Sequence, residues 1–357
     1  MSKHLVIVES PAKAKSINKY LGDEYTVMAS VGHIRDLPPK NLGLNVEESF
    51  LPEYVETDRG KKIIKELKSE AKKSANIYLA PDPDREGEAI AWHLYESLKD
   101  TAPEDCFYRV TYNEITKSAI LAAFEKPKKI NMDRVNAQQA RRILDRLVGF
   151  KGSPVVRKQI RGANSVGRVQ TVALRLVVER EMQIMNFKSE AYFKIAIKVA
   201  KQVHPKDPFI LKLVKINGES IGIKDRKLLP SAITSINQVN DIQHELIGSV
   251  LHISDVAIKE ITRKARAPFI TSTLQQSASG SFGYTPKRTM GIAQKLYEYG
   301  LITYMRTDSV NIAKSAQNEC RDFIRNSYGN EYIPEKLNIY GKKNKSAQEA
   351  HEAIRPT

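Results

Sequence analysis

The chain has 357 residues, of which 41% are apolar and 27% charged, a composition typical of a globular protein with about two or three domains. Lysine and arginine outnumber aspartate and glutamate by 57 to 41, and the net charge of +16 favours a polyanionic partner. The two cysteines, Cys106 and Cys320, exclude a disulfide framework and a four-cysteine zinc site. The sequence contains no apolar run of membrane-spanning length and no signal-peptide core, so we expect a cytoplasmic protein.

The chain begins with a predicted strand and helix. Residues 3–8 (KHLVIV) form an apolar run typical of a strand buried on both faces of a parallel sheet. Ser10 as N-cap and Pro11 as first helical residue predict a helix that extends to about residue 20. Glu9 then lies at the carboxyl end of the strand, where α/β sheets place ligands, and Lys13 adds positive charge. A solvated strand-to-helix turn explains this stretch alone equally well.

Further strands and helices follow in alternation. Residues 25–29 and 76–80 are predicted strands, and apolar periodicity predicts a helix between them over residues 60–73. Residues 36–59 are rich in proline, asparagine and acidic residues, and we expect them outside the core. A strand over residues 107–112 and a helix over residues 116–124 complete a compact α/β unit.

The strongest chemical pattern directly follows the strand at 76–80. Asp82, Asp84 and Glu86 alternate within a proline-rich turn. Carboxylates gathered at a strand end repel one another unless a cation lies between them, and all-oxygen ligands suit Mg²⁺. With Glu9 from the first strand end, they predict a magnesium site formed by Glu9, Asp82, Asp84 and Glu86. The alternative is an acidic helix N-terminus that the helix dipole stabilises.

An arginine-rich helical region follows. A helix predicted over residues 133–148 places Arg141, Arg142 and Arg146 away from its apolar side. An Arg142–Asp145 pair within this helix would give the charges a purely structural role. Residues 162–170 form a glycine- and serine-containing loop before a helix to about residue 185, and such a loop can bind phosphate.

The last part of the chain contains a region of predicted strands followed by a region of predicted helices. Alternating apolar residues predict strands over residues 191–199, 209–216, 220–223 and 249–261, with a hairpin at Asn217-Gly218 and no catalytic residues. Helices are predicted over residues 271–281, 286–299 and 311–328. Between the last two, Gly300 ends a helix and residues 301–305 are predicted to form a short buried strand. That strand would point Tyr304 and Arg306 the same way, although an isolated Tyr-x-Arg is usually structural.

Several longer motifs identify a family. Six sequence motifs occur in a fixed order along the whole chain: VESPAKAK, SVGHIRDLP, DPDREGEAIAWHL, QQARRILDRLVG, VGRVQTVALRLVVERE and AHEAIRPT. The first and third resemble the Toprim fold, and the set resembles the bacterial type IA DNA topoisomerases. The resemblance implies a mixed α/β and α+β multidomain protein. Its expected domains are a Toprim domain (1–129, with an excursion 37–62 that packs on the helical domain), a helical DNA-binding domain (130–190), the first half of a β-rich arch module (191–264) and an incomplete tyrosine domain (265–357) that continues beyond AHEAIRPT.

The resemblance also implies a mechanism. Tyr304 would attack DNA to form a 5′-phosphotyrosine, Glu9 would protonate the leaving 3′ oxygen, and Lys13 and Arg306 would stabilise phosphate charge. Mg²⁺ is the expected cofactor, and the absence of a P-loop motif agrees with a reaction that needs no ATP. We expect a monomer that acts on single-stranded regions of DNA in the nucleoid. The residues expected to bind DNA are His33, Arg85, Arg141, Arg142, Asp145, Arg168, Gln170, Asp308 and His351.

Other functions remain open at this level. Met305, where decatenating relatives usually carry proline, and the VESPAKAK opening favour relaxation of negative supercoils over a topoisomerase III-like decatenase. A Toprim primase or nuclease would use the same carboxylates but would not need Tyr304. A DNA-binding fragment without turnover is the remaining alternative, because the family's polypeptide extends further than this chain.

Overall fold

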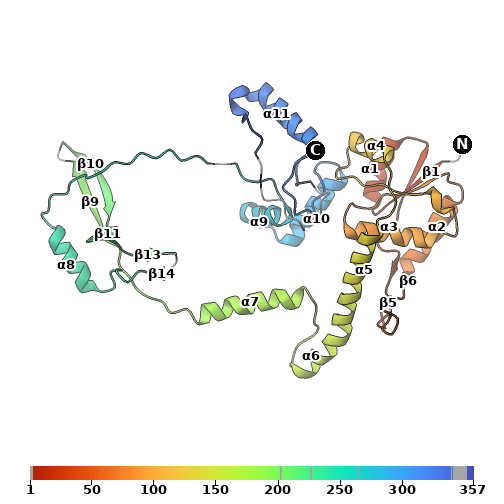
Figure 1. The fold of residues 1–357 in the computed structure, drawn as a ribbon, viewed down its shortest axis with the longest axis horizontal. Helices are drawn as coiled ribbons and strands as arrows, with labels where there is room; N and C mark the ends of the chain where they lie inside the picture. Colours follow the sequence, from red (N-terminus) through yellow and green to blue (C-terminus); the bar gives the residue numbers. More distant parts are fainter. Residues whose placement is uncertain (1–2, 202, 226, 264, 339, 341–351) are drawn as a thin grey trace. The chain divides into compact units, whose positions relative to one another are not determined.

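The computed structural model describes residues 3–201, 203–225, 227–263, 265–338, 340 and 352–357. The described residues form two compact units (Figure 1): residues up to 168 together with those from 265 onwards, and residues 169–263. The structure confirms the expected mixed α/β, multidomain fold. The finer division into four domains stays a prediction. No helix among the described residues is long and apolar enough to span a membrane.

A four-stranded parallel sheet forms the centre of the first unit. Its order is β2-β1-β7-β8, with β1 at His4–Val8, β2 at Tyr25–Ala29, β7 at Ile77–Leu79 and β8 at Phe107–Arg109. Successive residues of β1 enter two different cores, because side chains alternate across a strand. This confirms the predicted strand buried on both faces.

Helices cover both faces of the sheet. On one side lie α2 (Asp58–Ala71) and α3 (Arg85–Leu98), which share a core with alternate residues of β1. On the other lie α1 (Pro11–Leu21) and α4 (Lys117–Glu125). Each helix begins at a side chain that accepts a backbone N–H of the first turn, as N-caps do: Ser10, Thr57, Asp84 and Thr116. A 3₁₀ turn, η1 (Glu104–Cys106), precedes β8.

The acidic, proline-containing excursion forms two short antiparallel ladders, and its Leu37 and Leu44 are buried, contrary to the expectation that it lies outside the core. In the first, β3 (Arg35–Asp36) pairs with β6 (Val55–Glu56), and in the second β4 (Leu44–Asn45) pairs with β5 (Leu51–Pro52). The excursion contacts α3, where Tyr54 packs edge-on against the buried His93 at a ring-centroid distance of 4.5 Å.

Burial of His93 has a consequence for stability at low pH. Burial, with Arg35 and His33 nearby, lowers the pKa of His93 to about 3 from an ordinary 6.5, against a smaller opposite effect of Asp36. The folded protein therefore keeps this ring neutral at pH values where the unfolded chain binds a proton. The buried neutral ring therefore costs no stability above pH 6.5, and it lowers the free energy of unfolding progressively as the pH falls from 6.5 towards 3.

We therefore expect His93→Phe, which keeps an aromatic ring but cannot titrate, to weaken acid destabilisation. Between about pH 6.5 and 4, the free energy of unfolding of the wild type should fall more steeply, by up to about 1.4 kcal/mol per pH unit, than that of the variant. Urea unfolding at a series of pH values measures both slopes. Equal slopes would show that folding does not lower the pKa of His93.

The helical region after the sheet begins where the sequence predicted. Asn131 caps α5 (Met132–Leu147), which passes through a π-helical turn, η2 (Val148–Gly152), into α6 (Ser153–Gln159). The tyrosine-bearing part of the first unit contains α9 (Thr271–Phe282), α10 (Pro286–Glu298), α11 (Lys314–Tyr328) and a 3₁₀ turn, η3 (Asn330–Tyr332). Gly300 ends the turn after α10 with a φ of +68°, which confirms the predicted helix stop.

The predicted strand over residues 301–305 is wrong. Within it, Ile302 forms one isolated bridge with Pro356. The backbone N–H groups of Leu301, Thr303 and Tyr304 donate to carbonyls of Leu296, Arg355 and Asn113, three separate segments. A strand needs one neighbour along its length, so the apolar run forms an irregular, buried segment instead.

The second unit contains one long helix and several short strands. Asn217 and Gly218, with φ of 50° and 86°, join two paired strands and confirm the predicted hairpin. The elements of this unit are α7 (Gln170–Met185), β9 (Ala196–Lys201), β10 (His204–Lys212), β11 (Lys215–Ile216), β12 (Glu219–Ser220), β13 (Ile223–Lys224), β14 (Lys227–Leu228) and α8 (Ile236–Leu246).

The second unit contains one helix that was not predicted and one expectation that is wrong. Helix α8 lies between the strands predicted over residues 220–223 and 249–261, where no element was predicted, and its signal is a capping box in which Ser235 and Gln238 bond reciprocally to the backbone. Residues 249–261 contain the expected alternation but form no strand in the described part of the chain. Apolar side chains here, such as Ile258 at 91% exposed, have no neighbouring strand to pack against.

Candidate active site

A lysine and two carboxylates meet at the carboxyl ends of β1 and β7. Because these parallel strands are neighbours, Glu9 and Asp82 emerge at the same edge of the sheet. The backbone N–H of Asp82 donates to Glu9 Oε1 at 2.9 Å. Lys13, fully buried in the first turns of α1, places its Nζ 2.5 Å from Asp82 Oδ1 and 3.2 Å from Glu9 Oε2. The structure thus brings three predicted site residues into direct contact.

The protonation of this cluster follows from its charges. Burial raises the pKa of Asp82 to about 7, an increase that Lys13 opposes and Glu9 reinforces. Burial also acts to raise the pKa of Glu9, but Lys13 and the hydrogen bonds from Asp82 lower it overall. Burial disfavours the charged form of Lys13, yet the two carboxylates raise its pKa. At neutral pH the cluster therefore holds a lysine cation, an ionised Glu9 and an Asp82 that titrates.

Tyr304 lies beside this cluster. Its side chain is buried, with the ring edge-on to Tyr297 at a centroid distance of 5.2 Å, and its O–H donates to Asp84 Oδ2 at 2.5 Å. Arg306 Nη1 lies 3.7 Å from the same carboxylate oxygen. Burial, with Asp82 and Asp84 nearby, raises the pKa of Tyr304, and Arg306 opposes this. The phenol is neutral in this arrangement, and its proton faces a carboxylate.

Direct contacts fix the tyrosine segment against the α/β domain. Besides the Tyr304 N–H to Asn113 carbonyl bond, Ser10 Oγ donates to Glu298 Oε1 at 2.9 Å. Arg355 Nη2 donates to Glu114 Oε2 at 2.8 Å, with both side chains about four-fifths buried. These bonds join residues more than 180 positions apart, so the position of Tyr304 depends on this interface.

Adjoining cavities give access to the site. The largest, about 860 Å³, is lined by Glu9, Asp82, Asp84, Glu86 and Arg306, with His33 and Arg141 among its other walls. A cavity of about 510 Å³ shares Asp84, Arg141 and Arg306 with it and adds Arg85 and Asp308. A third, about 300 Å³, extends from His33 and Glu86 to Arg142 and Asp145. Carboxylates and arginines therefore both line the hollow that these adjoining cavities form, a surface suited to a phosphate chain and a cation together.

The four predicted metal ligands share the largest cavity but do not converge on one point. Within the described residues, no three histidine, cysteine, aspartate or glutamate side chains are placed to hold a metal ion. Asp84 caps α3 through Gly87 N, and Glu86 Oε2 accepts a bond from Gln138 Nε2 at 3.2 Å. The donor chemistry nevertheless fits Mg²⁺, because this ion takes few carboxylates, keeps several waters and requires oxygen ligands.

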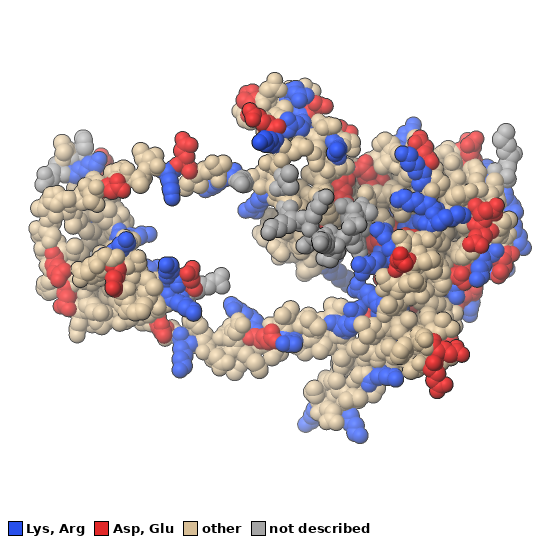
Figure 2. Space-filling view, in the orientation of Figure 1, with Lys and Arg blue, Asp and Glu red and all other residues tan. Residues whose placement is uncertain are grey.

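The residues expected to bind DNA are distributed over the same hollow and beyond it. His33 lies 4.0 Å from Glu86, and Arg85, Arg141 and Asp308 line the cavities. Gln170 begins α7 in the second unit, and His351 lies outside the described residues. Figure 2 shows basic side chains on many parts of the visible face, in keeping with the net charge of +16.

The proposed Arg142–Asp145 pair within α5 is not formed. Arg142 instead forms a bidentate pair with Asp36 of the excursion, in which Nε donates to Oδ1 at 3.1 Å and Nη2 donates to Oδ2 at 2.6 Å. Asp145 pairs with Arg168, at 2.7 Å. The guanidinium of Arg142 reaches across to β3, because a planar fork binds a facing carboxylate better than a neighbour three residues along its own helix.

Sequence reasoning missed a buried ion pair behind the acidic loop. Arg109 and Glu88 are both at least 97% buried and bonded at 3.1 Å. Arg109 also donates to the carbonyls of Leu79, Pro81, Asp82 and Val110, so it holds the loop that presents Asp82. The available signal was an arginine at the end of an apolar strand with an acidic residue inside the DPDREGE motif.

This fold and site define a Toprim protein, and residues 4–115 match the model of the Toprim domain. Residues 129–357, more than half of the chain, match the family described as DNA topoisomerase. The chain therefore belongs to the DNA topoisomerase family.

Individual relatives are similar along the whole chain. DNA topoisomerase 1 of Rickettsia bellii (strain RML369-C) is 48% identical over 99% of this chain, and that of Xylella fastidiosa (strain 9a5c) is 48% identical over 100%. The matched region is 44% of each relative, so the chain spans less than half of their length. The solved structure of full-length topoisomerase I from Thermotoga maritima matches with a TM-score of 0.76 and 37% identity, over 99% of this chain and 55% of that one.

Proposed function

We propose that this chain provides the cleavage machinery of a type IA DNA topoisomerase. Such an enzyme breaks one DNA strand through a 5′-phosphotyrosine, passes a strand through the break and reseals it without ATP, relaxing negative supercoils. The observation that carries the proposal is Tyr304, whose O–H contacts Asp84 beside the Glu9–Lys13–Asp82 cluster. A Toprim nuclease would need the carboxylates but not a tyrosine held among them.

Each residue has a role in this proposal. Tyr304 Oη attacks the phosphorus, a P–O(Tyr) bond forms, and the bond from phosphorus to the 3′ oxygen breaks. The phenol proton passes to Asp84, whose carboxylate accepts a hydrogen bond from the phenol in the resting structure. The leaving 3′ oxygen takes a proton from Glu9. Because Glu9 is ionised at rest, that proton comes to it from the neighbouring Asp82, whose raised pKa leaves it partly protonated near neutral pH. The reverse steps reseal the strand.

The basic residues have different electrostatic roles in this proposal. Lys13 is fully buried between Glu9 and Asp82, so it sets the charge of the cluster. The Arg306 side chain is 58% exposed and lines the cavity, so it is the better placed cation for a phosphate oxygen. Arg141 and Arg85 line the same hollow and would bind neighbouring phosphates without selecting a sequence.

Glu9, Asp82, Asp84 and Glu86 are the residues that would hold Mg²⁺. When bound, the ion supplies positive charge that aligns the DNA backbone for resealing. The exchange of one phosphodiester for another conserves bond free energy, so ATP is not required. Strand passage would require the contacts that fix Tyr304, including Arg355 to Glu114, to open and close.

Trapping the covalent intermediate tests this function. A single-stranded oligonucleotide, labelled at either its 5′ or its 3′ end, is incubated with the protein and Mg²⁺ and then denatured. We expect only the 3′ label to migrate with the protein, because the tyrosine retains the 5′ phosphate of the downstream fragment. The 5′ label on the protein would contradict this polarity, cleavage without any adduct would indicate a nuclease, and binding without cleavage a DNA-binding module.

A further inference from the structure

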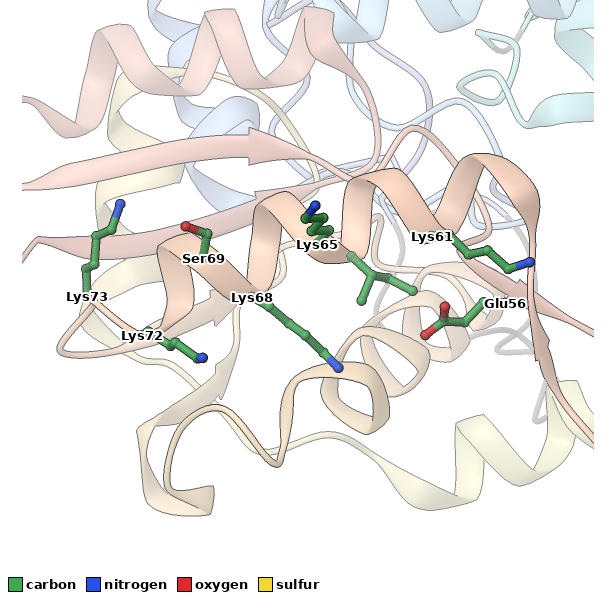
Figure 3. Close-up of a pocket in the computed structure, with 8 residues that line it drawn as sticks. Glu56, Lys61, Lys65, Lys68, Ser69, Lys72 and Lys73 are labelled. Atoms are coloured by element: carbon green, nitrogen blue, oxygen red, sulfur yellow. The ribbon is translucent and has the colours of Figure 1, made fainter.

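Helix α2 carries a row of lysines outside the candidate active site. Figure 3 shows Lys61, Lys65, Lys68, Lys72 and Lys73 distributed along the helix and just beyond its end. They line a shallow depression of about 580 Å³ together with Glu56, Ile64 and Ser69. None of these residues lines the cavities around Tyr304. We call the five lysines the α2 lysine face.

The spacing of the lysines places them on one side of a fixed helix. Lys61, Lys65, Lys68 and Lys72 follow one another at intervals of four, three and four residues, which align along an α-helix. Eleven residues of helix extend over about 16 Å. The adjoining side of α2 is buried in the core of the first unit through Ile64, Leu67 and Ala71. The lysines thus stand on a rigid support.

Most of this charge is not neutralised by neighbouring carboxylates. Lys61 and Lys73 form exposed ion pairs at 3.5 Å, with Asp58 and Glu70. Lys65, Lys68 and Lys72 form no ion pair within the described part of the chain. Five lysines against one glutamate around the depression leave a local excess of positive charge.

The chemistry of the face indicates its ligand. Ammonium groups bind phosphates as point charges, and a row of them fits a polyanion with regularly spaced phosphates. No aromatic side chain is among the residues that line the depression, so unpaired bases have nothing to stack on. A backbone whose bases are already paired suits the face better than a single strand.

We propose that the α2 lysine face binds the phosphate backbone of duplex DNA, as a second contact separate from the site of strand cleavage. This inference rests on the proposed function, because a topoisomerase that cleaves a single strand acts within DNA that is largely double-stranded. The row of about 16 Å is long enough to contact about five phosphates of one strand, which follow one another at about 3.4 Å along the helix axis.

A charge-matched pair of variants tests the proposal. Lys65→Gln/Lys68→Gln/Lys72→Gln removes three charges from the face. Lys19→Gln/Lys117→Gln/Lys126→Gln removes three from exposed positions on α1, at the boundary of α4 and just after it. Binding of a random-sequence 30-base-pair duplex is measured between about 50 and 300 mM salt. The slope of log K against log salt should weaken by up to about 2.7 in the first variant, and duplex affinity at 0.1 M salt should fall at least about tenfold.

The control variant should retain most of the wild-type dependence of log K on log salt. Both variants should form as much covalent adduct with a single-stranded oligonucleotide as the wild type does. Equal losses in both variants, or no loss in the first, would overturn the proposal. The proposal would also be overturned if the wild type bound phosphatidylglycerol vesicles and the first variant did not, while both bound duplex DNA equally well. If the wild type forms no adduct, the proposed function fails, but the duplex comparison still decides whether this face binds DNA.

Discussion

Replacement of Tyr304 by phenylalanine is expected to abolish the covalent protein–DNA adduct, with a loss on the order of 10⁴-fold or more, because no other group takes the place of the nucleophile. The substitution keeps the ring that packs on Tyr297 and removes only the hydroxyl bonded to Asp84. The fold should lose about 1 kcal/mol. Single-stranded DNA should still bind, since the backbone contacts come from the arginines. Adduct yield and filter binding measure the two effects.

Tyr297→Phe is the matched control for this experiment. Tyr297 is the neighbouring buried tyrosine, and among the described residues its hydroxyl has no hydrogen-bond partner. Removal of that hydroxyl should leave the adduct yield unchanged. If Tyr304→Phe still forms adduct, or if Tyr297→Phe loses it as completely, Tyr304 is not the nucleophile.

Replacement of Arg109 by methionine is expected to destabilise the first unit by about 3–5 kcal/mol, because Glu88 would then be buried without its cation. The carbonyls of Pro81 and Asp82 would also lose their donor. Since these carbonyls belong to the loop that presents Asp82, adduct formation should fall at temperatures where the variant remains folded. Urea unfolding measures the first effect and the oligonucleotide assay the second.

Arg134→Met provides the comparison. Arg134 donates to the carbonyl of Pro83 in the same loop at 3.2 Å, but it is only partly buried and forms no ion pair within the described residues. Its loss should cost no more than about 0.5 kcal/mol. If Arg109→Met lowers the free energy of unfolding as little as Arg134→Met does, the buried pair does not hold the loop.

Local patterns predicted most of the first unit correctly. The apolar runs at β1 and β7, the cap at Ser10, the helix predicted over residues 116–124 and the helix stop at Gly300 depend on neighbours in sequence, and the structure agrees with them. Helix α8 was missed, although the capping box formed by Ser235 and Gln238 marks its start. The strand expected at residues 301–305 failed because strands depend on a partner, which local pattern does not specify.

The sequence by itself determined the family, through motifs in a fixed order, and it determined which residue types carry the chemistry. Only the tertiary structure decided what those residues contact. Arg142 pairs with Asp36, 106 positions away, and Arg109 holds the loop of Asp82 from the next strand. The proton of Tyr304 faces Asp84, 220 positions earlier in the chain. Such contacts, and the pKa values that they set, depend on distance and burial in three dimensions, which spacing along the chain does not contain.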